Sequence, residues 1–275
     1  MIVDTHVHPV ATDLARYPLN PAAGEDWFKD APMTAEMFLE QMEIAGVDQA
    51  VLVQAFTAHG YDNSYAADAA ARYPDTYVAV ARIDPLSRDA PDILSYWVEQ
   101  RGVRGVRLGM EKPEEVDHPR SLPLWVRASQ LGITVSVQLA GEARRSGLPA
   151  VARILDRFPG VNVVLDHLAH APALDLVALA RHPNLYLKFS SINILWVNSG
   201  QTAPDRRGYF ERLFEAYGAR RMMWGSDFPH TKGGPGGPYT ELVDLARGTL
   251  SFLTPEDREE ALGGTARRLY PALAS

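Results

Sequence analysis

The chain of 275 residues contains no cysteine. Disulfide bonds, thiolate metal ligands and a cysteine nucleophile are therefore excluded. It also lacks an apolar run that approaches the roughly 18 residues needed to span a membrane as a helix. Basic residues are in the minority, since 27 lysines and arginines face 34 aspartates and glutamates, for a net charge of −7. This negative charge disfavours nucleic acid and anionic membranes as partners, although a local arginine cluster could still bind an anionic substrate.

The absence of cysteine fits the reducing cytoplasm, and we expect a soluble cytoplasmic protein. A cleaved signal peptide would remove the earliest candidate site residues, which begin at Asp4. Hydrophobic residues make up 46% of the chain, which is enough for a large core. No low-complexity linker divides the sequence, so we expect one domain over residues 1–275.

Short apolar stretches alternate with longer helical patterns along the whole chain. We expect strands at Ile2–His8, Gln49–Phe56, Tyr77–Asp84, Val103–Gly109, Ile133–Leu139, Val161–His167, Leu185–Ser190 and Met222–Asp227. Helices are expected over Thr34–Gly46, Asn63–Tyr73, Asp89–Gly102, Ser121–Gly132, Leu148–Phe158, Ala173–Arg181 and Gly208–Tyr217, and from Thr254 onward. Nearly continuous hydrophobicity is typical of parallel strands that helices cover. The pattern predicts a single (β/α)₈ TIM barrel of the α/β class, with a doubly wound open sheet as the alternative.

Two histidines mark the end of the first expected strand, in Asp4-Thr-His6-Val-His8. Residues two apart in a strand point to the same side, so His6 and His8 should converge. Asp227, at the end of the last expected strand, could complete the group. Two histidines and a carboxylate can hold a divalent metal ion, or can act as base and electrophile without one. The alternative is an ordinary strand with polar residues at its rim.

The other expected strands also end in polar side chains. Barrel active sites lie at the carboxyl ends of the strands, so these side chains are candidates for one shared site. They are Gln54, Arg82, Asp84, Arg107, Gln138, His167 and Ser190.

The chain resembles the amidohydrolase superfamily, and within it the amidohydrolase-2 branch. The resemblance covers the whole chain and rests on Asp4-x-His6-x-His8, Val-Leu-Asp166-His167, Trp224-Gly-Ser-Asp227-Phe-Pro and Gly263-Gly-Thr-Ala-Arg-Arg-Leu-Tyr270. In the last motif Thr265 stands where an asparagine is usual. The branch contains lactonases that act on sugar acids and on 2-pyrone-4,6-dicarboxylate, and it also contains metal-dependent decarboxylases.

Two positions depart from the metal-using members of this branch. Those members usually have a histidine at the fifth strand, where this chain has Gln138, and binuclear members have a bridging lysine at the fourth, where it has Arg107. An amide oxygen is a poor zinc ligand and a guanidinium does not ligate, so a binuclear centre is disfavoured. The resemblance implies either one divalent ion, zinc or manganese, held by His6, His8 and Asp227, or no metal. Both alternatives remain open.

Asp227 is the expected general base that takes a proton from water, and His167 is expected to polarise a carbonyl or shuttle a proton. The competing interpretations are a cap or salt bridge for Asp227 and a core histidine for His167. Because neighbours in a strand face opposite ways, Asp166 is expected to point away from the pocket of His167.

Arg107 and Arg82 are candidate clamps for a substrate carboxylate, although structural ion pairs would also explain them. Gln54, Gln138 and Ser190 could contact a hydroxyl or a lactone carbonyl, or support neighbouring groups. His230 is a further candidate for substrate contact, whereas the other histidines are expected to be structural: His59, His118, His170 and His182.

Two loops could border the site. The stretch Ile192–Gly200, with Trp196, is expected to form a wall or lid, with exposed packing as the alternative. The glycine- and proline-rich stretch Gly233–Pro238 is expected to be an active-site loop.

The first functional hypothesis is a hydrolase that opens a small lactone of a sugar acid or of an aromatic-degradation intermediate. The second is metal-dependent, non-oxidative decarboxylation of an aromatic or muconate-like acid, which the Gln138 departure weakens. The third is a non-catalytic barrel that serves as a binding protein. In the first two we expect a small carboxylate-bearing substrate, and a homodimer formed through the outer helices is possible.

Overall fold

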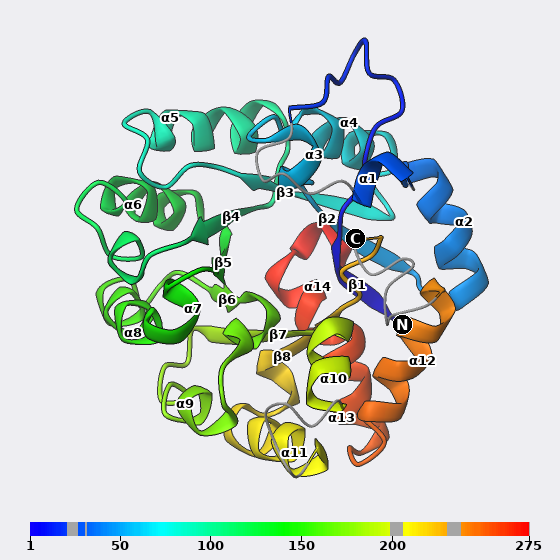
Figure 1. Ribbon diagram of the computed structural model, residues 1–275, viewed down its shortest axis with the longest axis vertical. Helices are drawn as coiled ribbons and strands as arrows, with labels where there is room; N and C mark the ends of the chain where they lie inside the picture. Colours follow the sequence, from blue (N-terminus) through cyan, green and yellow to red (C-terminus); the bar gives the residue numbers. More distant parts are fainter. Residues whose placement is uncertain (21–26, 31, 199–205, 230–237, 275) are drawn as a thin grey trace.

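The computed structural model describes residues 1–20, 27–30, 32–198, 206–229 and 238–274. In this part of the chain eight parallel strands form one sheet in sequence order. They are β1 (Val3–Val7), β2 (Gln49–Val53), β3 (Tyr77–Arg82), β4 (Gly105–Met110), β5 (Thr134–Leu139), β6 (Val163–Leu165), β7 (Leu185–Ser190) and β8 (Met222–Gly225). β1 lies beside β8 and the helices surround the strands (Figure 1). The predicted (β/α)₈ barrel is confirmed.

Helices follow the strands, most of them around the outside of the barrel (Figure 1). They are α1 (Trp27–Asp30), α2 (Ala35–Ala45), α3 (Phe56–His59), α4 (Ser64–Arg72), α5 (Ala90–Ser95), α6 (Leu122–Leu131), α7 (Ala143–Ser146), α8 (Leu148–Arg157), α9 (Ala173–Val177), α10 (Ser191–Asn198), α11 (Arg206–Tyr217), α12 (Tyr239–Thr249), α13 (Pro255–Glu259) and α14 (Thr265–Leu269). Single turns of other helix types are η1 (Tyr96–Gln100), η2 (Pro113–Glu115), η3 (Asp166–His170), η4 (Ala219–Arg221), η5 (Glu260–Gly264) and η6 (Pro271–Leu273). Among the described residues, no helix combines the length and apolarity required to cross a membrane.

Local signals in the sequence set several helix ends as predicted. The hydroxyl of Thr34 accepts a hydrogen bond from the N–H of Met37 at 3.2 Å and caps α2, which Gly46 ends with a left-handed φ of 67°. Thr254 caps α13 in the same way. By contrast, β6 and β8 stop before His167 and Asp227, so both residues lie on the loops above the barrel and not on strands.

The amino-terminal end of the barrel is filled by apolar side chains. Val3, Val51, Val80 and their neighbours pack there against Tyr270 and Leu273 from the end of the chain. Figure 1 shows α14 in the middle of the ring of strands. This plug leaves the carboxyl end of the barrel for polar side chains.

The seam between β1 and β8 is closed by hydrogen bonds that also hold the predicted site. The N–H of Asp227 donates to the carbonyl of His6, and the N–H of His8 donates to that of Phe228, each at 2.8 Å. Beside them the buried carboxylate of Asp4 accepts from the N–H of Ser226 at 2.8 Å and from the hydroxyl of Tyr239 at 3.0 Å. Burial raises the pKa of Asp4 to about 6. The first and last strands of the barrel are thereby joined at the site itself.

The seam predicts a destabilising effect for Gly225→Ala. A Cβ at this position would lie 2.6 Å from the Cβ of His6, so the strands would have to separate. We expect the free energy of unfolding to fall by about 2 kcal/mol. Gly248→Ala in α12, where a Cβ meets no atom within 4 Å, should leave it unchanged or raise it by up to about 1 kcal/mol. Urea unfolding of both variants checks this, and equal midpoints would contradict it.

Candidate active site

A cavity of about 440 Å³ opens at the carboxyl end of the barrel. The described residues that line it are His8, Trp27, Phe56, Thr57, Arg82, Arg107, Glu111, Gln138, Ala140, Arg144, His167, His170, Ile192 and Asp227. Six of these were predicted as site residues from the sequence, and His6 lies buried beneath them. The predicted His230 and most of the loop Gly233–Pro238 lie outside the described residues.

His6, His8 and Asp227 converge at the floor of the cavity, as predicted. The Nε2 atoms of the two histidines are 3.2 Å apart, and the Oδ1 atom of Asp227 lies 3.6 Å from Nε2 of His6 and 3.3 Å from Nε2 of His8. Asp227 reaches this place with a left-handed φ of 63°, which aspartate adopts more readily than most residues. Because the lone pairs of two imidazole nitrogens and a carboxylate oxygen would repel one another at these distances, a proton or a metal ion must lie between them.

The donor set fits a single divalent ion. The three ligand atoms lie within 4.8 Å of one another, and two imidazoles with one carboxylate leave an open position for water or substrate. Gln138, at the position of the fifth-strand ligand, instead accepts a hydrogen bond from Arg82 through its amide oxygen. A site with three protein ligands is therefore the fullest metal centre that these residues offer.

The hydrogen bond of His8 fixes its protonation. Its Nδ1 lies 2.9 Å from the carbonyl oxygen of Val53, and a carbonyl can only accept, so Nδ1 carries the proton and Nε2 presents a lone pair. Burial lowers the pKa of His8 and outweighs the opposing effect of Asp227. Burial also holds the pKa of His6 well below its usual value, with Lys188 and Arg107 adding to the shift.

Asp166 does not line the cavity that His167 lines, as expected, but the expectation that the two face opposite ways is wrong, because both contact Arg107 and His6 inside the barrel. The strand ends at Leu165, and residues 167 to 170 all have left-handed φ values between 48° and 51°. This turn also carries His170, expected to be structural, to the cavity wall, where its ring meets the Trp196 ring at 5.8 Å. Ile192 lines the same cavity, which supports the interpretation of the described part of Ile192–Gly200 as a wall.

Asp166 is the centre of a buried ion-pair network. Asp166 is 1% exposed; its Oδ2 accepts a hydrogen bond from Nε of Arg107 at 2.8 Å, and its Oδ1 forms an ion pair with Nζ of Lys188 at 3.0 Å. Burial alone would raise the pKa of Asp166, but Lys188 and Arg107 hold it below its usual value. Lys188 was missed in the sequence, although it lies two residues before Ser190 in the same strand and so faces the same side.

His167 is held in one neutral form by its neighbours. The hydroxyl of Ser190 donates to Oδ1 of Asn193 at 2.9 Å, so its oxygen accepts from Nδ1 of His167 at 3.0 Å. Nε2 of His167 is then a lone pair, 3.4 Å from Nη2 of Arg107. Burial lowers the pKa of His167 to about 4. Ser190 therefore orients His167 and does not line the cavity.

Arg82 differs from Arg107 in having no carboxylate partner among the described residues. Its side chain is 7% exposed, donates to the Gln138 amide oxygen at 2.8 Å and lies over the Phe56 ring at 4.5 Å. Gly109 makes the room, because a Cβ there would collide with the guanidinium. Burial lowers the pKa of Arg82 to about 9, and Arg107 adds to the shift. A buried cation is thus left facing the cavity.

The remaining described residues that the sequence analysis named contact nearby backbone or acidic groups outside the cavity. Gln54 is turned away from the cavity, since its amide nitrogen donates to the carbonyls of Gly60 and Asp62. Three histidines that were expected to be structural make local contacts to backbone or acidic groups, as expected: His59, His118 and His182.

Comparison with known proteins identifies the family of this chain. The model of the amidohydrolase family matches residues 3–272. The chain belongs to the amidohydrolase family. The resemblance inferred from the sequence motifs is confirmed.

This amidohydrolase is 27% identical over 246 residues to the L-fucono-1,5-lactonase of Burkholderia ambifaria, covering 82% of this chain and 81% of the relative. A candidate 2-pyrone-4,6-dicarboxylic acid hydrolase of Pseudomonas putida has a TM-score of 0.77 at 24% identity, over 98% of this chain and 97% of that one. An amidohydrolase of Burkholderia multivorans with bound zinc has a TM-score of 0.75 at 20% identity, over 98% and 99%. Decarboxylases also share the fold. At these identities the solved structures support the fold alone.

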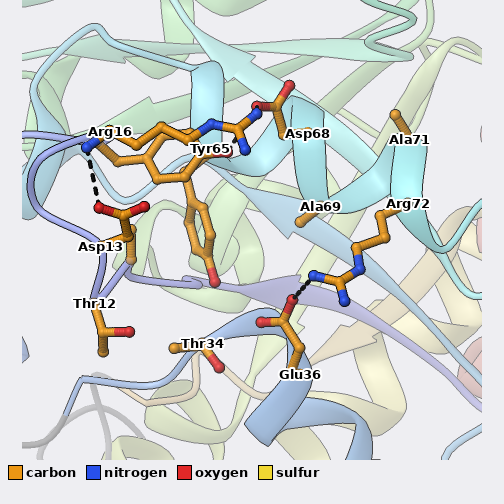
Figure 2. A pocket seen from close by; sticks show the side chains of 12 residues that line it. Thr12, Asp13, Arg16, Thr34, Glu36, Tyr65, Asp68, Ala69, Ala71 and Arg72 are labelled. Atoms are coloured by element: carbon orange, nitrogen blue, oxygen red, sulfur yellow. Dashed lines mark hydrogen bonds and ion pairs between the residues drawn. The ribbon is translucent and has the colours of Figure 1, made fainter.

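A second cavity of this amidohydrolase, of about 530 Å³, lies outside the barrel beside α2 and α4. Figure 2 shows Arg72 paired with Glu36 across it, at 2.9 Å. Arg16 pairs with Asp68 at 2.7 Å. Because these charges are satisfied by one another, this cavity offers no group that awaits a ligand.

The lowered pKa of His167 predicts a loss of stability on acidification. Its folded value of about 4 lies below the unfolded value of 6.5, so between these pH values the unfolded chain binds the proton first. The contribution of neutral His167 to the free energy of unfolding is therefore fully present above pH 6.5, and it is lost as the pH falls toward 4. Between pH 7 and pH 5 this loss should be about 2 kcal/mol.

The measurement is urea unfolding of the wild type and of His167→Gln at pH 7 and pH 5. The variant should lose less stability on acidification. Asp4, whose raised pKa acts in the opposite direction, is present in both proteins and cancels in the difference. Parallel pH dependences would contradict the assignment.

Proposed function

We propose that this amidohydrolase is a lactonase that opens a small cyclic ester with water. The observation that carries the proposal is a carboxylate, Asp227, in contact with His8 and within reach of His6 at the floor of the cavity. The lactonase relative over most of the chain supports the same reaction class. A general base beside neutral imidazoles is suited to attack by water on an ester carbonyl.

In the proposed reaction Asp227 takes a proton from water while the water oxygen bonds to the lactone carbonyl carbon. The ring C–O bond then breaks, and the proton that Asp227 took from the water passes to the leaving oxygen. His167 is placed to accept and return a proton through the lone pair on Nε2, which is the shuttle role expected from the sequence. Polarisation of the carbonyl by His167 would need a proton on Nε2, so Nη2 of Arg107, 3.4 Å away, is the better donor to the oxyanion.

Where a divalent ion is bound, His6, His8 and Asp227 are the residues that would hold it, and it would supply a Lewis acid for the carbonyl. The roles of Arg107 and His167 do not depend on this ion. Decarboxylation remains the second hypothesis of the sequence analysis, but the engagement of Gln138 with Arg82 removes the ligand that it would need. A homodimer stays a prediction.

We also propose that the substrate carries a carboxylate and that Arg82 binds it. Arg107 is already neutralised by Asp166, whereas Arg82 is buried without a carboxylate partner among the described residues. A buried unpaired charge is costly, so an anionic substrate that neutralises it gains affinity. Arg82 and Arg107, which the sequence analysis gave the same role, therefore differ in their proposed roles.

Asp227→Asn should abolish the general base without changing the backbone, because asparagine also tolerates a left-handed φ. We expect kcat to fall by about 10²–10⁴-fold and the melting temperature to stay close to that of the wild type. The assay follows acid release from L-fucono-1,5-lactone and from 2-pyrone-4,6-dicarboxylate. Asp244→Asn on the exposed side of α12 is the matched control, and retained turnover in Asp227→Asn would reject the mechanism.

Arg82→Gln tests the substrate class. If Arg82 binds a carboxylate, KM for 2-pyrone-4,6-dicarboxylate should rise about 10–100-fold, while turnover of an uncharged sugar lactone should hardly change. Arg72→Gln, at the second cavity, should behave like the wild type toward both. Preference of the wild type for the uncharged lactone, with no effect of Arg82→Gln on either, would contradict the role of Arg82.

A further inference from the structure

Lys188 lies beneath the cavity and has no role in the reaction as described so far. Its side chain is 0% exposed, and its Nζ lies 3.0 Å from Oδ1 of Asp166 and 3.3 Å from Nδ1 of His6. Burial lowers the pKa of Lys188, but the ion pair with Asp166 opposes that shift and favours the ammonium form, which only donates hydrogen bonds. Nδ1 of His6 must therefore present its lone pair to Lys188.

This contact fixes the proton of His6 on the other nitrogen. A neutral imidazole carries one proton, so Nε2 of His6 is the N–H and points toward Nε2 of His8 at 3.2 Å and Oδ1 of Asp227 at 3.6 Å. His8 uses its own N–H on the carbonyl of Val53 and has only a lone pair at Nε2. The His6 proton therefore supplies the positive charge that the three converging atoms require.

A metal ion would need the opposite arrangement. To ligate through Nε2, His6 must carry its proton on Nδ1 and donate it, usually to a carboxylate or a carbonyl. The carboxylate in reach is Asp166, 4.0 Å from Nδ1, but its Oδ1 is held by Lys188. Lys188 thus takes the acceptor that a metal-bound His6 would use, and it places a positive charge beside the ion.

We propose that Lys188 is a positioning residue that holds His6 as the Nε2–H tautomer and thereby weakens zinc binding at His6, His8 and Asp227. The proton on Nε2 of His6 then occupies the place that the ion would take. This inference does not depend on the proposed lactone substrate.

The test is Lys188→Met in the full chain, freed of metal with a chelator and titrated with zinc against a chromophoric competitor. We expect the zinc affinity to rise at least about 10-fold, the scale of such supporting contacts, because Nδ1 of His6 can then donate to Asp166. Lys112→Met, an exposed lysine on the loop after β4, should bind zinc like the wild type. Equal affinity in the wild type and Lys188→Met would overturn the proposal.

A second measurement already tests the proposal on the wild type, in case loss of the ion pair prevents the variant from folding. In metal-free wild type with ¹⁵N-labelled histidine, the ring nitrogen correlations of His6 should show the proton on Nε2. In Lys188→Met they should show it on Nδ1. A wild-type His6 with its proton on Nδ1 would overturn the proposal, whereas failure of the lactonase assays would leave both readouts unaffected.

Discussion

The site depends on one buried carboxylate, Asp166, held between two cations. Arg107 and Lys188 each pair with it from inside the barrel, and each reaches a histidine with its remaining donors, His167 for Arg107 and His6 for Lys188. Loss of this carboxylate would leave two buried charges unpaired, at a cost of about 3–5 kcal/mol or more. Asp166 does not line the cavity, yet through these two cations it acts on His6 and His167.

His167 reaches the cavity because the chain leaves β6 in a left-handed turn of residues without a glycine. Such backbone costs about 1–2 kcal/mol per residue, so surrounding contacts must hold it. The ion pairs of Asp166, directly before the turn, and the bond from Nδ2 of Asn193 to the carbonyl of His167, at 2.8 Å, are such contacts. The turn also brings His170 to the cavity, so one strained segment places the proposed proton shuttle and a wall residue.

Much of this could be predicted from the sequence. The alternation of apolar runs and capped helices gave the barrel, and the period of two in a strand gave the convergence of His6 and His8. Lys188 could have been found by the same rule, as a lone cation in an apolar strand in phase with Ser190. That both Asp166 and His167 face the interior could not be predicted, because no residue type in the turn indicates a left-handed backbone. Nor could the sequence tell Arg82 from Arg107, since their difference lies in which carboxylate each one meets across the barrel.

That difference has an electrostatic consequence for the whole site. Inside the barrel lie three buried cations, Arg82, Arg107 and Lys188, and three buried carboxylates, Asp4, Asp166 and Asp227. Asp4 is engaged at the seam by Ser226 and Tyr239, and Asp166 pairs with both Arg107 and Lys188. Arg82 lines the cavity without a carboxylate partner among the described residues, so an anionic substrate group can pair with it there. A divalent ion at His6, His8 and Asp227 would instead lie beside the cation Lys188, which already contacts His6. Both effects originate in side chains that the barrel holds before any substrate arrives.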